Sequence, residues 1–123
     1  MLSVHIDNIG DVAVIECEGR IVRSEAAFEL RKAVTSEASA RTIVLDLTEV
    51  HAIEGGGLGM LGALQRWALD QGIRLRLYNP TSSVRNTLER NDWMQFDIAS
   101  VEEVTALLAG AETNAECQYS KAA

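Results

Sequence analysis

The fold is decided by the stretch IVLDLTEVHAIEGGGLGML, residues 43–61, in which a strand pattern changes into a helix pattern. Its first residues form a mostly apolar run that is typical of a strand covered on both faces. Apolar residues then recur at helical spacing, at Leu58, Leu61, Leu64 and Ala68. The two elements are joined by Glu54-Gly55-Gly56-Gly57, and a helix that begins there directs free N–H groups outward. This junction is therefore suited to bind an anion, a nucleotide or a loop of a partner protein.

Other segments on both sides of the junction have clear strand or helix patterns. The expected strands are residues 2–7 and 12–17, which form a hairpin, then 42–48, 73–77 and an edge strand around 93–98. The expected helices follow Ser24, occupy residues 57–71 and 83–90, and run from Val101 to Leu108 after the capping box of Ser100 and Glu103. These elements predict one α/β domain, with a mixed, mostly parallel sheet of about five strands and about four helices. We assign the domain to residues 1–110 and interpret residues 111–123 as a polar, disordered tail.

The composition restricts the classes of function. The 123 residues are enough for one domain with one core. The 18 acidic and 11 basic residues give a net charge of -7, which disfavours binding to nucleic acid or anionic lipid and favours a basic protein partner. No apolar run approaches the ~20 residues that span a bilayer, and the N-terminus lacks a signal pattern, so we predict a cytoplasmic protein without direct membrane insertion. Cys17 and Cys117 lack metal-ligand spacing, which predicts free thiols and neither metal nor cofactor.

Several separate motifs resemble those of the STAS domain, the fold of anti-sigma-factor antagonists and of the cytoplasmic tails of sulfate transporters. The matching segments are Cys17–Ile21, Leu45–Val50, Ile53–Leu61, Gly72–Pro80 and Val84–Leu88. Of these, Ile53–Leu61 is similar to the family's hallmark Ile-Asp-Ser-Ser-Gly-Leu-Gly-x-Leu. The resemblance covers roughly residues 2–109 and implies a fold and a class of protein–protein interaction.

The resemblance also implies a phosphorylation switch, in which a partner kinase phosphorylates a serine at the junction and the phosphate breaks the complex. In this chain Glu54 stands at the position of the family's Asp, Gly55 and Gly56 at its two Ser positions, and Gly57 at its Gly. No hydroxyl group remains there to accept phosphate, and Gly56 occupies the position of the family's phosphoacceptor serine. Val22 stands where the family often has an acidic residue. We therefore expect protein binding without this switch.

Catalysis and nucleotide binding have weaker support at the junction. His51 and Glu54 suggest an acid–base pair, but no nucleophile or second carboxylate with fixed geometry accompanies them, so we predict that the protein is not an enzyme. The glycines are not followed by the Lys and Ser/Thr of a phosphate-binding loop. Gly57 is interpreted as part of a tight turn, and Gly55 and Gly56 as places where a partner's backbone comes close.

The helix after the junction carries a stripe of Met60, Ala63 and Trp67. These residues either belong to the core or form an exposed apolar strip that docks a partner helix or supports a homodimer.

Our leading hypothesis is a protein-interaction module of signal transduction and transcription regulation, which binds a kinase-like anti-sigma factor. The alternative is a soluble subunit of a membrane transport complex, which binds a transporter subunit or an ATPase through the same surface. In both hypotheses the partner-binding residues are Gly19, Arg20, Val22, Arg23, Glu54, Gly55, Gly56, Gly57, Gly59, Met60 and Trp67.

Overall fold

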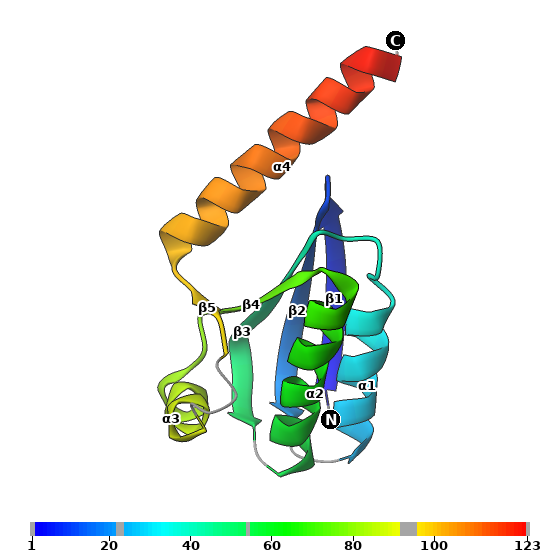
Figure 1. Cartoon of the computed structure of the whole chain (residues 1–123). Coiled ribbons are helices and arrows are strands. Elements are labelled where there is room, and N and C mark those ends of the chain that lie inside the picture. Colours follow the sequence, from blue (N-terminus) through cyan, green and yellow to red (C-terminus); the bar gives the residue numbers. More distant parts are fainter. Residues whose placement is uncertain (1, 22–23, 54, 92–95, 123) are drawn as a thin grey trace.

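A computed structural model describes residues 2–21, 24–53, 55–91 and 96–122. Within these ranges the chain forms five strands and four helices (Figure 1). Their bounds are β1 Leu2–Ile9, β2 Val12–Ile21, α1 Ser24–Thr35, β3 Thr42–Ile53, α2 Gly56–Gln71, β4 Arg74–Tyr78, α3 Ser82–Arg90, β5 Ile98–Ala99 and α4 Val101–Ala122. None of these helices is long and apolar enough to span a bilayer, as far as the described residues extend.

The five strands form one mixed sheet in the order β1-β2-β3-β4-β5. The hairpin of β1 and β2 is antiparallel, and β2, β3, β4 and β5 pair in parallel. The helices α1, α2 and α3 connect the parallel strands, because such strands need a crossover instead of a tight turn. The predicted single α/β domain with a mostly parallel sheet is thus confirmed.

The main core lies on the face of the sheet that α1 and α2 cover side by side (Figure 1). Buried strand residues such as Ile15, Leu45 and Leu77 meet apolar residues of the three connecting helices, among them Leu30, Leu61 and Leu88. Cys17 belongs to this core, and its burial, together with the nearby charge of Asp46, raises the pKa of its thiol to about 12.

A smaller cluster lies on the opposite face, because successive residues of a strand point to opposite sides. It contains Val12, Val44 and Ala99 of the sheet and Val104 and Ala111 of α4. A Cβ on Gly10, whose φ is +60°, would lie 2.6 Å from the carbonyl oxygen of Ala111. The first half of α4 therefore packs on the sheet as far as the β1–β2 turn, and the rest of the helix extends beyond the sheet (Figure 1).

Two expected element bounds were wrong. The last helix does not end at Leu108 but continues to Ala122. The edge strand β5 has only the two residues Ile98 and Ala99, and Trp93 lies outside the described residues. The capping box was predicted correctly, since Glu103 N donates to Ser100 Oγ at 3.1 Å and Ser100 N donates to Glu103 Oε1 at 3.3 Å. The division into a domain of residues 1–110 and a tail stays a prediction.

Candidate functional site

The candidate site lies where two parallel strands end beside the start of a helix. Ile21 at the end of β2 pairs with Ile53 at the end of β3, and α2 begins at Gly56. In α/β folds, ligands and partners are commonly bound at the carboxyl ends of parallel strands. We call this region, residues 19–21 and 55–59, the glycine junction. Val22, Arg23 and Glu54, which we predicted to belong to it, lie outside the described residues.

Gly57 is required by packing inside the glycine junction. The residue is buried, and an ideal Cβ on it would lie 1.7 Å from the carbonyl oxygen of Ile21. Real Cβ atoms essentially never come within 3.0 Å of another heavy atom. The first turn of α2 can therefore cross the end of β2 only because residue 57 has no side chain.

Gly55 has a conformational reason to be glycine. Its φ of +56° lies in the left-handed region that L side chains rarely adopt. It is the residue before α2, and its carbonyl oxygen accepts a hydrogen bond from Gly59 N at 3.2 Å. A side chain at residue 55 would strain the backbone even though nothing lies within 4 Å of its Cβ position.

Gly56 and Gly59 need to be glycine neither for packing, as Gly57 does, nor for backbone conformation, as Gly55 does. Both are exposed and have no positive φ, and a Cβ on either would meet none of the described residues within 4 Å. Ala63, one turn further along α2, is exposed as well. The outer surface of the first turns of α2 is consequently bare backbone and small side chains. A partner can approach the axis of this helix more closely than it could approach an ordinary helix surface.

The stripe of Met60 and Trp67 lies at the edge of the main core. Both side chains are half-buried and pack against the buried residues of that core. Each therefore contributes to the packing of α2 and also presents part of its surface to solvent. Neither forms a fully exposed apolar strip beside the glycine junction.

The β2 side of the glycine junction contributes Gly19 and Arg20. Gly19 has a φ of +123°, and the register between β2 and β3 shifts between these two residues. Arg20 is exposed and pairs across the sheet with Ala52. Its guanidinium is the charged group that the described part of the junction offers to an acidic partner.

Arg76 of β4 is a charged residue that the sequence analysis did not single out. It is only 6% exposed and lies under the start of α4, away from the glycine junction. The only sign of Arg76 in the sequence is the alternation of Arg74 and Arg76 with Leu75 and Leu77. This alternation is equally typical of arginines on a solvent-exposed face of the strand, so it does not indicate that Arg76 is buried.

Comparison with protein families identifies one that matches most of the chain. The family model described as "Mlab, STAS domain" matches residues 4–100. Comparison with curated proteins gives no match.

Solved structures show the same fold. The anti-sigma factor antagonist SpoIIAA in its unphosphorylated form is 18% identical, with 88% of this chain and 97% of that chain covered and a TM-score of 0.71. An anti-sigma factor antagonist from Mycobacterium paratuberculosis is 15% identical, with 89% and 95% covered and a TM-score of 0.72. SLC26A9 is 16% identical, with 90% of this chain and 21% of that chain covered and a TM-score of 0.66. At these identities the likeness concerns the fold.

Proposed function

Since the chain belongs to the STAS domain family, we propose that it is a non-enzymatic protein-interaction module of the anti-sigma-factor-antagonist type. The observation that carries this proposal is the bare surface of Gly56 and Gly59 at the glycine junction. Gly59 lies within α2, where a glycine costs about 1 kcal/mol relative to alanine, and Gly56 is the first residue of that helix. Neither the backbone conformation nor packing against the described residues requires glycine at these two positions, so close approach by a partner explains them best.

The chemistry of the glycine junction supports binding in preference to catalysis. From Gly55 to Gly59 the only side chain larger than hydrogen is that of Leu58, and it is half-buried. These residues offer no nucleophile, acid or base to a substrate. Affinity would come from shape fit and from the burial of apolar surface, with Arg20 adding charge complementarity at the rim.

A kinase-like anti-sigma factor is the partner that we propose first. In that complex the partner's backbone would lie against α2 at Gly56 and Gly59, and the exposed parts of Met60 and Trp67 would flank the contact. No phosphate cycle would regulate the complex through this segment, because Gly55 and Gly56 replace the serines of the family.

The alternative function, a soluble subunit of a membrane transport complex, is favoured by the same missing hydroxyls. A permanent subunit has no need for a switch that releases it. The fold also occurs within the longer chain of SLC26A9, of which this chain covers 21%. Both functions use the glycine junction, and the identity of the bound protein separates them.

Affinity capture from the cells that make the protein tests the proposal. We expect the tagged wild-type chain to retain one protein in stoichiometric amount, which mass spectrometry identifies as a kinase-like regulator or as a transport component. The variant Gly59→Trp will lose this protein, and Ala106→Trp, which adds the same bulk at an exposed position of α4, will keep it. Equal retention by all three proteins would contradict the proposed site.

A phosphorylation experiment distinguishes a lost switch from one that has moved. After incubation with the captured partner and ATP, we expect the Ile53–Gly59 peptide to remain unmodified, because it contains no hydroxyl. Mass spectrometry of the digested protein measures this. Phosphate on Thr48, which is exposed in the middle of β3, would show instead that the switch had moved. With a kinase-like partner, we expect Gly56→Ser to become phosphorylated.

A further inference from the structure

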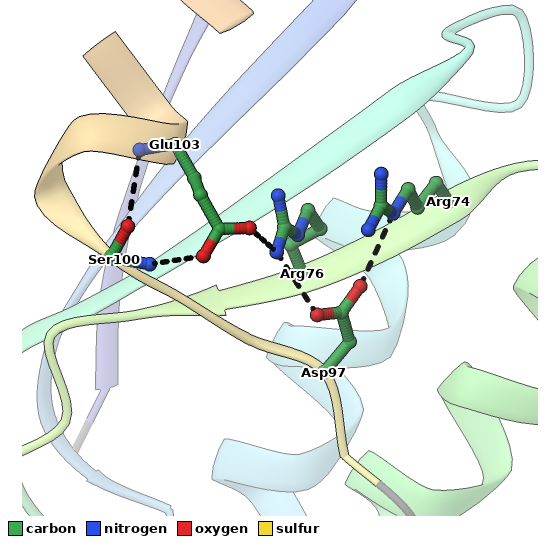
Figure 2. Close-up of polar contacts among 5 residues, drawn as sticks. All are labelled: Arg74, Arg76, Asp97, Ser100 and Glu103. Atoms are coloured by element: carbon green, nitrogen blue, oxygen red, sulfur yellow. Dashed lines mark hydrogen bonds and ion pairs between the residues drawn. The ribbon is translucent and has the colours of Figure 1, made fainter. Parts of the chain in front are cut away.

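Arg76 forms a charged cluster between the sheet and α4 (Figure 2). Its side chain is 8% exposed, and its Nη2 donates to Asp97 Oδ1 at 3.1 Å and to Glu103 Oε2. Asp97 precedes β5 and also accepts from Arg74 Nε at 3.2 Å. Glu103 belongs to the first turn of α4. One buried guanidinium therefore ties the last helix to β4.

The same contacts keep both partners charged. The hydrogen bond from Arg76, followed by those from Ser100, lowers the pKa of Glu103. Burial alone would lower the pKa of Arg76, but the hydrogen bonds to Glu103 and Asp97 outweigh it, so this pKa is raised. We call the contact between Arg76 and Glu103 the latch.

The apolar contact beside the latch is small. From Val101 to Ala111, α4 buries only Val104 and Ala111, and Leu107 and Leu108 are half-buried. Val101 is 57% exposed. The floor under the helix consists of Val12, Val44 and Ala99, with Ile9, Val14 and Tyr78 around it. This area is much smaller than the main core on the other face of the sheet.

The latch adds little net stability to the closed arrangement. The side chain of Arg76 is 8% exposed, but those of its partners Asp97 and Glu103 are 35% and 49% exposed. Ion pairs with such exposed partners contribute little net stability. Among the described residues the buried Arg76 Nε has no hydrogen-bond partner, so its lost hydration is not fully compensated. If α4 moves away, the buried Arg76 regains water, and only a small apolar area is exposed. From this balance we propose that α4 is a detachable arm, which the latch holds on the sheet and which opens without unfolding the domain.

The connection between β5 and α4 allows such an opening. The strand β5 pairs with β4 through Ile98 and Ala99, and Ser100 separates it from the helix. Rotation of the backbone at Ser100 would move α4 while β5 stays in the sheet. A released helix loses its apolar partner, and most of the stability of a helix in a protein comes from such tertiary packing. Its backbone amides will then exchange with solvent.

Hydrogen exchange of the full chain, measured by mass spectrometry at two salt concentrations, tests the proposal. At low salt we expect amides of residues 104–111 to exchange at least about tenfold faster than those of residues 43–47 in β3, which need global unfolding. Raising the salt from about 0.05 to 1 M shortens the screening length from above 10 Å to about 3 Å and weakens the latch. We expect α4 exchange to rise about threefold further, relative to β3. Equal exchange of α4 and β3 at both concentrations would overturn the proposal.

Two variants assign the salt effect to the latch. Arg76→Met keeps an apolar stem but removes the charge, so the salt dependence of α4 exchange will disappear. Its control, Arg74→Met, removes an exposed charge that pairs with Asp97 and not with Glu103 among the described residues, and the salt dependence will persist. If Arg76→Met does not fold, Glu103→Gln tests the other partner, and we expect faster α4 exchange with unchanged β3 exchange. An undiminished salt effect in Arg76→Met, or unchanged α4 exchange in Glu103→Gln, would disprove the latch.

Discussion

Gly57→Ala will lower the free energy of unfolding by more than about 3 kcal/mol or prevent folding. The added methyl group would lie 1.7 Å from the carbonyl oxygen of Ile21 and 2.6 Å from its carbonyl carbon. These are backbone atoms of a buried strand, so they cannot rotate away as a flexible side chain would. Relief requires α2 to separate from β2, which opens the main core around Leu61. Urea denaturation followed by circular dichroism measures the loss.

Gly59→Ala is the matched control in the same helix. Its methyl group meets nothing within 4 Å, and alanine favours a helix by about 1 kcal/mol over glycine. We therefore expect this variant to be more stable than the wild-type protein by up to about 1 kcal/mol. Opposite signs for two glycine-to-alanine changes two residues apart would establish that packing at Gly57, and not helix propensity, governs the first. A Gly57→Ala protein with the wild-type urea midpoint would contradict the contact with Ile21.

Gly59→Trp will weaken partner binding about 100-fold, which corresponds to roughly 2.7 kcal/mol. The large side chain would occupy the space over α2 that the proposed partner's backbone needs. Gly59 is the better position for this test than Gly55, whose φ of +56° would make any substitution a test of strain as well. Calorimetric titration with the protein recovered by affinity capture measures the effect, and thermal melting shows whether the fold is intact.

Ala106→Trp serves as the control for added bulk, since Ala106 is exposed on α4. We expect it to bind with wild-type affinity. Unchanged affinity of Gly59→Trp would move the interface away from the glycine junction and leave the fold assignment intact. Weakened binding by both variants would indicate a general effect of an exposed tryptophan.

Much of the fold was predictable from local patterns. The change from strand to helix between residues 43 and 61 depends on residues that are close together in the sequence, and so does the capping box of Ser100 and Glu103. The extent of α4 was not predictable, because residues 111–123 lack an apolar period. Similarly, β5 is held by pairing with Leu77 and Tyr78 of β4, which a local pattern does not reveal.

The sequence predicted the candidate site as a cluster of glycines, but it did not predict which glycine is required for packing and which is exposed. Gly56 and Gly57 are neighbours with the same side chain, and only the position of the Ile21 carbonyl distinguishes them. The burial of Arg76 likewise depends on Asp97 and Glu103, which lie 21 and 27 residues away along the chain. Roles that arise from contacts between distant segments are set by the tertiary structure, and local pattern carries no signal for them.

The sheet has the strand order β1-β2-β3-β4-β5, which is the order of the strands along the chain. Each strand that leaves the ribosome can therefore join the open edge of the strands made before it, and none has to be inserted between two strands that are already paired. At each stage the next strand joins the edge opposite β1, and the outer edge of β1 stays open. The short β5 is the last strand to be added, and α4 then covers part of the second face. The strand order thus permits the domain to assemble in the order in which its strands are synthesised.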